Sequence, residues 1–163
     1  MSLSSNKFNG FSLIEMVATL AIVSILAAMA MPYAKMGIIR NQEFELQRSL
    51  REIRNALDEF HRDWKNERHN KLEQTASRNG YPVSLQVLVD GVPLAGQISG
   101  RKKYLRRIPR DPFTDQSLPV TQHWQLIGYK DDPDTDTWNG EDIYDVRSKS
   151  SRQALNKSYY RDW

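Results

Sequence analysis

The sequence predicts an α+β fold, in which a long N-terminal helix, made of a membrane segment and an amphipathic stalk, packs against a small C-terminal antiparallel β-sheet head. Three observations support this fold class. Of the 21 residues from 11 to 31, 17 are apolar. A second apolar stripe recurs every three or four residues between Leu46 and Trp64. Short segments rich in β-branched and aromatic residues follow near the C-terminus.

The first predicted element is a helix over residues 11–32. Its apolar run would rise about 31 Å, the thickness of the hydrocarbon core of a bilayer. Three hypotheses fit such a run: a secretory signal peptide, for which residues 28–30 (Ala-Met-Ala) have the form of a cleavage site, a passive membrane anchor, and a prepilin-type segment. Glu15 distinguishes among these hypotheses, because inserting a carboxylate into a membrane within an apolar run costs about 2.5–3.5 kcal/mol. A signal peptide or passive anchor gains nothing from that cost.

The run Gly10-Phe11-Ser12-Leu13-Ile14-Glu15 resembles the prepilin peptidase signature of type IV pilins and type II secretion pseudopilins. The resemblance implies a leader over residues 1–10, cleavage by prepilin peptidase between Gly10 and Phe11, N-methylation of Phe11, and an assembly role for Glu15. Pro32 lies where members of this family also tend to carry proline. In a filament, the new amine of Phe11 would meet Glu15 of a neighbouring subunit in a low-dielectric core, where an unpaired charge is costly.

The second predicted element is an amphipathic stalk over residues 33–70. Its apolar stripe consists of Leu46, Leu50, Ile53, Leu57, Phe60 and Trp64. We expect this stripe to pack against the head, with a coiled coil as the alternative. No strong helix breaker lies between Pro32 and Gly80, so one helix is predicted from about residue 11 to residue 64 or beyond.

Residues 71–163 are predicted to form a globular head. Pro82 precedes a short apolar segment that predicts a helix, and residues 91–100 are expected to be a loop. An extended, proline-punctuated segment over residues 104–113 resembles a linker that crosses the head in the pilin-like family. Strands are predicted over residues 123–130 and 142–147, with a turn over residues 131–140.

Acidic residues crowd this turn, and they are candidate calcium ligands because Ca²⁺ takes six to eight oxygen ligands. The candidates are Asp132, Asp134, Asp136, Glu141 and Asp142. An EF-hand is excluded, because a loop counted from Asp132 has Thr137 and Ile143 at the glycine and final-ligand positions. Major pseudopilins carry a C-terminal calcium loop, but its glycine-rich, aspartate-terminated pattern is not reproduced here. Two hypotheses stay open: a calcium site, or acids solvated in a turn with no cofactor required.

Charge is distributed in blocks. Residues 101–110 hold six basic side chains and no acidic ones, whereas residues 121–145 hold seven acids and one base. Such blocks predict charge-complementary contact within the fold or between copies. The basic block has no aromatic stacking platform and no nucleic-acid motif, so a nucleic-acid partner is not expected.

No nucleophile–base arrangement, phosphate-binding loop or paired acid–base signature is visible, so we do not expect an enzyme. The resemblance instead implies a single-pass protein of the bacterial inner membrane with its head in the periplasm. It would join other pseudopilins at an inner-membrane assembly platform and self-assemble into a helical periplasmic filament that drives type II secretion. The chain is most like the major, or G, pseudopilin, and its lack of cysteine favours that class, since many type IV pilins close a C-terminal disulfide loop. The alternative is a type IV pilin or minor pilin that acts in adhesion or DNA binding.

Overall fold

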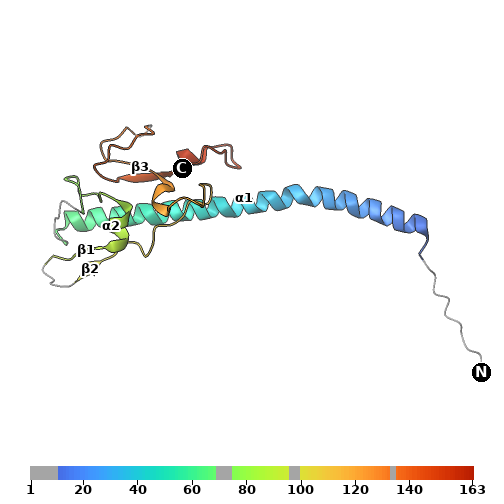
Figure 1. Ribbon diagram of the computed structural model, residues 1–163, viewed down its shortest axis with the longest axis horizontal. Helices are drawn as coiled ribbons and strands as arrows, with labels where there is room; N and C mark the ends of the chain where they lie inside the picture. Colours follow the sequence, from blue (N-terminus) through green and yellow to red (C-terminus); the bar gives the residue numbers. More distant parts are fainter. Residues whose placement is uncertain (1–10, 69–74, 96–99, 133–134) are drawn as a thin grey trace, which may run out of the picture. The chain divides into compact units, whose positions relative to one another are not determined.

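The computed structural model describes residues 11–68, 75–95, 100–132 and 135–163, without the side chains of residues 30–32 and 34. Its elements are α1 (Leu13–Lys65), α2 (Leu85–Asp90), β1 (Val92–Pro93), β2 (Arg101–Lys102), η1 (Val120–Gln122), β3 (Trp124–Ile127), β4 (Asp145–Ser148) and η2 (Tyr160–Asp162) (Figure 1). A long N-terminal helix with small antiparallel sheets confirms the predicted α+β class. The chain divides into two compact units, Met1–Ile39 and Arg40–Trp163.

In the first unit, α1 presents apolar side chains to its surroundings. The backbone N–H of Met16 donates to the carbonyl of Ser12 at 3.1 Å, which begins the helical hydrogen bonding. The hydroxyl groups of Thr19 and Ser24 donate to carbonyls one turn back, so these polar groups need no outside partner. All described side chains from residue 11 to residue 29 are exposed. This part of the helix therefore has an apolar surface that its neighbouring described residues leave exposed.

In the part of the chain that the structure describes, no helix has both the length and the apolar character needed to cross a membrane. The membrane-spanning character predicted for residues 11–32 is therefore not confirmed.

In the second unit, residues 40–65 of α1 carry the core. The predicted apolar stripe is confirmed: its members are almost fully buried, apart from the partly buried Trp64. Burial of a leucine or phenylalanine side chain contributes about 1.5–3 kcal/mol, so this stripe supplies much of the stability of the head. Helix α1 ends at Lys65, close to the predicted end.

Helix α2 and the β1–β2 pair form one part of the head. The short helix expected after Pro82 is present as α2. Its last residue is Asp90, and its C-cap is Gly91, whose φ of +76° is in the region that favours glycine. A Cβ atom there would lie 2.6 Å from the carbonyl oxygen of Lys102, so glycine also permits the close approach of β2. The prediction of a loop over residues 91–100 was wrong at its start, because Val92 pairs with Lys102 in an antiparallel ladder.

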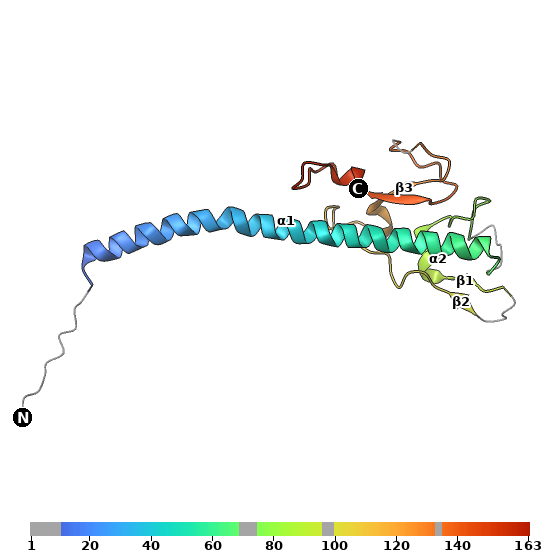
Figure 2. The ribbon, with the colours of Figure 1, turned by 180° about the vertical axis from the view of Figure 1, so that it is seen from behind.

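The β3–β4 pair forms the other part of the head. Its register places Leu126 opposite Val146 and Trp124 opposite Ser148. Both strands were predicted, but β3 is shorter than expected and β4 begins at Asp145 rather than at residue 142. The described residues of the head thus form two separate two-stranded sheets instead of the single sheet expected. Figures 1 and 2 show that β2 and β3 lie on opposite sides of α1.

Candidate functional site

The predicted processing site lies at the start of α1. Gly10 and the rest of the leader lie outside the described residues. Phe11 precedes the helix, and 78% of its surface is exposed. Glu15 lies in the first turn of α1, where the helix dipole favours a negative charge. Glu15 is thus the fifth residue after the predicted cleavage point and the third residue of α1.

Glu15 is also an unneutralised charge on an apolar helix. Its side chain is exposed, and it makes no hydrogen bond or ion pair with any other described residue. Its neighbours along the helix, including Leu13, Ile14 and Val17, are apolar and exposed. A carboxylate in such surroundings is stable in water, but in a low-dielectric environment it requires a cation. This arrangement can thus recognise a positively charged group presented by another molecule.

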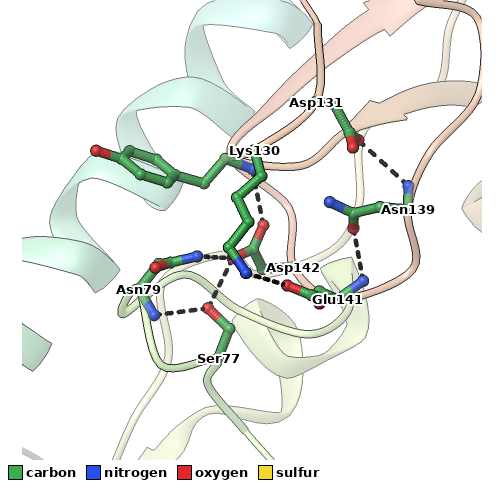
Figure 3. Close-up of polar contacts among 8 residues, drawn as sticks. Ser77, Asn79, Lys130, Asp131, Asn139, Glu141 and Asp142 are labelled. Atoms are coloured by element: carbon green, nitrogen blue, oxygen red, sulfur yellow. Dashed lines mark hydrogen bonds and ion pairs between the residues drawn. The ribbon is translucent and has the colours of Figure 1, made fainter.

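The acidic turn forms a different kind of site, centred on Asp142 (Figure 3). Asp142 is buried, and its carboxylate accepts hydrogen bonds from the Ser77 hydroxyl at 2.7 Å, the Asn79 amide at 3.1 Å and the Tyr129 backbone N–H at 2.8 Å. The backbone N–H of Ile143 donates to the carbonyl of Pro82. Asp142 therefore joins the turn to residues 77–82, and its oxygen atoms are engaged within the chain.

The other predicted calcium ligands that the structure describes differ in their surroundings. Glu141 forms an ion pair with Lys130 at 3.1 Å (Figure 3). Asp132 and Asp136 are exposed, and Asp134 lies outside the described residues. Within the described ranges, no three acidic or histidine side chains are arranged to hold a metal ion. The calcium hypothesis therefore stays a prediction.

A neighbouring carboxylate, which was not among the calcium candidates, shapes the turn. Asp131 Oδ2 accepts the backbone N–H of Gly128 at 2.7 Å and that of Asn139 at 3.3 Å. A Cβ atom at position 128 would lie 2.7 Å from the side-chain amide nitrogen of Asn139, so a larger residue there would require this exposed side chain to move. The close approach of these two residues thus closes the turn around Asp131.

Sequence reasoning missed a buried charge on the stalk, at Asp63. Its carboxylate accepts hydrogen bonds from Lys102 at 2.6 Å and from the Tyr104 hydroxyl at 3.0 Å, and Arg68 lies at 3.5 Å. Burial raises the pKa of Asp63, but the two hydrogen bonds and the charges of Lys102 and Arg68 outweigh burial and lower the pKa below its ordinary value. The position of Asp63 in the sequence could have indicated its burial, because it lies three residues after Phe60, on the edge of the apolar stripe.

A second missed carboxylate, Asp111, lies in a buried cluster with His123 and Ser148. Asp111 accepts the Ser148 hydroxyl at 2.6 Å, and the Asp111 backbone N–H donates to Nδ1 of His123 at 3.3 Å. Nε2 of His123 lies 3.1 Å from the carbonyl oxygen of Leu118. A nucleophilic triad needs the histidine between the serine and the acid, whereas here the serine bonds the acid directly. The cluster joins the linker to β4.

The N-terminal part of the chain matches a known family model. The model of the prokaryotic N-terminal methylation motif matches residues 5–31. Searches of curated proteins and of solved structures gave no match. The matched range contains the predicted cleavage point and Glu15. The motif marks type IV pilin-like proteins that are processed as prepilins, and it points to a structural subunit that enters a pilus-like filament rather than to an enzyme.

Proposed function

We propose that this chain is a pseudopilin, a structural subunit of the type II secretion pseudopilus. It is stored in the inner membrane with unit Arg40–Trp163 in the periplasm, cleaved by prepilin peptidase, N-methylated at Phe11 and assembled with other pseudopilins at an inner-membrane platform. The observation that carries the proposal is the methylation motif at residues 5–31, together with Glu15, which has no partner among the described residues and lies in the first turn of an apolar helix.

The structure supports an assembly role for Glu15 by what surrounds it. The exposed apolar side chains of the first unit would be buried in a filament core, where removing them from water is favourable. The same burial would remove the water that solvates the Glu15 carboxylate. The positive amine of Phe11 on an adjacent subunit is the partner that would neutralise it, and such a pair fixes the stagger between subunits.

The preference for a pseudopilin over a type IV pilin rests on the C-terminal segment. The chain has no cysteine, so no disulfide ties this segment to the head. Polar contacts hold it instead: Glu43 accepts the Leu155 backbone N–H at 2.8 Å and the Tyr160 hydroxyl at 3.0 Å, while Arg54 donates to the Trp163 carbonyl at 2.7 Å.

The second candidate function is that of a type IV pilin or minor pilin acting in adhesion or DNA binding. The observation that favours it is a pair of exposed arginines, Arg106 and Arg107, which make no side-chain hydrogen bond or ion pair with other described residues. Neutralising both should abolish DNA binding if this candidate is right, and should leave secretion unchanged.

Replacement of Glu15 by valine in the full chain tests the proposed function. Cleavage before Phe11 should continue, because Gly10 and the leader are unchanged, but filament assembly and secretion should fail. The matched control is Glu45→Val, which removes an exposed carboxylate from the stalk. Normal secretion by a cleaved Glu15→Val chain would refute the proposal.

A further inference from the structure

We propose that an aromatic patch on the head of one subunit binds two arginines on the head of the next subunit along the filament. The aromatic patch consists of Tyr81, Tyr129 and Tyr144, and the arginine pair consists of Arg106 and Arg107. The inference rests on the filament-forming function proposed above, and it adds a specific contact between heads to that function.

The aromatic patch brings together three tyrosines from separate segments of the head. The ring of Tyr81 stacks on that of Tyr129, with centroids 5.7 Å apart, and meets the ring of Tyr144 edge-on at 5.2 Å. The rings of Tyr129 and Tyr144 also meet edge-on, at 5.6 Å. Tyr81 is buried, whereas Tyr129 and Tyr144 are 55% and 48% exposed. The patch is therefore a continuous group of rings, two of which are accessible to another molecule.

The aromatic patch is held in place before any partner binds. The backbone N–H of Tyr129 donates to the carboxylate of Asp142 at 2.8 Å, and that of Tyr144 donates to the carbonyl of the last residue of β3 at 2.8 Å. The ring of Tyr81 stacks on that of His61 in α1, with centroids 4.3 Å apart. Tyrosine side chains lose little conformational entropy on binding, so a patch of this kind is suited to an interface.

The surroundings of the aromatic patch favour a positively charged partner. The face of an aromatic ring attracts a cation, and no cation among the described residues lies over any of the three rings. Burial raises the pKa of Tyr81, and the nearby negative charges of Asp58 and Asp142 raise it further. Asp58 has no ion pair with other described residues, and the described donors to the Asp142 carboxylate are neutral. Arginine suits such a surface, because its planar guanidinium group stacks on aromatic rings.

The arginine pair lies at a bend of the chain between Leu105 and Ile108, which are both buried. The backbone N–H of Leu105 donates to a carbonyl of α2 at 2.9 Å, which fixes the bend on the head. Arg106 and Arg107 are exposed, and their side chains make no hydrogen bond or ion pair with other described residues. Residues 101–110 include no acid. Two positive charges on an ordered backbone therefore remain available to another molecule.

The arginine pair and the aromatic patch are not in contact within one head as the structure describes it. The pair follows β2 and Tyr129 follows β3, and these two strands lie on opposite sides of α1 (Figures 1 and 2). Their complementarity is therefore available between heads. A contact between two different surfaces is heterologous, and repetition of a heterologous contact that does not close into a ring produces a helical filament.

Paired substitutions in the full chain test the contact, in cells that carry prepilin peptidase and the assembly platform. We expect Tyr129→Leu with Tyr144→Leu to lower filament yield by about tenfold, because leucine lacks the ring face that attracts a cation. Arg106→Gln with Arg107→Gln should lower the yield by a similar factor. Because both changes remove the same contact, all four substitutions together should lower the yield no further than either pair alone.

Two control variants separate the ring faces from other effects of substitution. Tyr129→Phe with Tyr144→Phe keeps both rings and should keep the filaments. Tyr159→Leu changes an exposed tyrosine outside the patch and should have no effect. The amount of cleaved chain in the membrane should match that of the wild type in all variants, because the substituted side chains are exposed.

Cross-linking provides a measurement that leaves the contact itself unaltered, because the chain has no cysteine. Lys103 and Lys130 are exposed and adjoin the arginine bend and the aromatic patch, respectively. Filaments carrying Lys103→Cys with Lys130→Cys should give a ladder of multimers with a short bis-maleimide. The control, Lys103→Cys with Lys157→Cys, also has two exposed positions and should give no ladder.

The results separate failure of the contact from failure of the proposed function. Normal filaments in both paired variants, a further fall in yield when they are combined, or no ladder would overturn the contact and leave the proposed function standing. Normal filaments with impaired secretion in the leucine variant would indicate that the patch binds an exported protein, and would also overturn the contact between copies. Failure of the wild-type chain to form filaments would overturn both proposals.

Discussion

Asp63 shows how a single buried carboxylate links the stalk to the head. It is 2% exposed and is the acceptor for two side chains from residues 102–104. A carboxyl group whose pKa is lower in the folded than in the unfolded state stabilises the fold at pH values above its unfolded pKa. For Asp63 the ordinary pKa is 3.8, and its contribution to stability is lost as the pH falls through the lower pKa of the folded state. The head should therefore lose stability in acid partly through this residue.

Replacement of Asp63 by asparagine tests this account. The change leaves Lys102 without its buried partner, and we expect the free energy of unfolding at pH 7 to fall by about 1–3 kcal/mol. The loss should shrink as the pH falls below about 4, because the wild-type carboxylate becomes protonated there. Chemical denaturation of residues 40–163 at several pH values measures both effects, with Asp58→Asn on the exposed face as control. An equal loss at all pH values would contradict the role of the charge.

The calcium prediction also belongs at the scale of residues. Asp142 already accepts three hydrogen bonds from the chain and Glu141 is paired with Lys130, so we expect no thermal stabilisation by calcium. Melting curves of residues 40–163 with millimolar calcium and with a chelator should coincide. A higher midpoint with calcium would show that the turn binds the ion, because a ligand that binds only the folded state stabilises it.

At the scale of elements, the second half of α1 is the scaffold of the head. Leu57 is 1% exposed and lies in the middle of the stripe that contacts the head. Leu57→Ala should lower the free energy of unfolding by about 2–5 kcal/mol, because it removes buried apolar atoms and leaves a cavity. Leu118→Ala, at a position 39% exposed, should cost far less. Denaturant titration compares the two, and similar losses would argue against a core centred on the stalk.

An element could be predicted from the sequence where its residues form a local pattern of apolar and polar positions. The stripe from Leu46 to Trp64 repeats over several turns, so both the helix and its buried face were predicted correctly. Strands β1 and β2 have two residues each, and Pro93 lies in one of them, so no alternation was visible. Their pairing depends on the close approach of Gly91 to Lys102, which no residue pattern marks. For the same reason, one sheet was expected where the described residues form two.

The candidate sites also divide into those that a local sequence pattern marks and those that depend on distant partners. Glu15 could be found because it interrupts an apolar run, which is a local pattern. Asp63, Asp111 and Asp142 have roles set by partners 12 to 65 residues away, and no local pattern marks those partners. Clustered acids in the turn therefore suggested a metal site, although the structure engages the most buried of them with protein donors.

At the scale of the whole molecule, we expect the two units to behave differently in solution. The second unit has its own core, whereas the first exposes apolar side chains along its helix. A chain of residues 40–163 should thus fold and remain monomeric, because the apolar surface is removed. Circular dichroism and sedimentation measure fold and mass. Large oligomers that persist in high salt would instead indicate a coiled-coil stalk.

The central claim is that the chain is a prepilin-type subunit, and the mass of the mature protein tests it most directly. When the full chain is produced with prepilin peptidase, intact mass and N-terminal sequencing should show a protein that begins at N-methylated Phe11 and keeps its apolar helix. Gly10→Val should block this cleavage. A mature chain that begins at Met31, or one that keeps its first ten residues beside an active peptidase, would contradict the account.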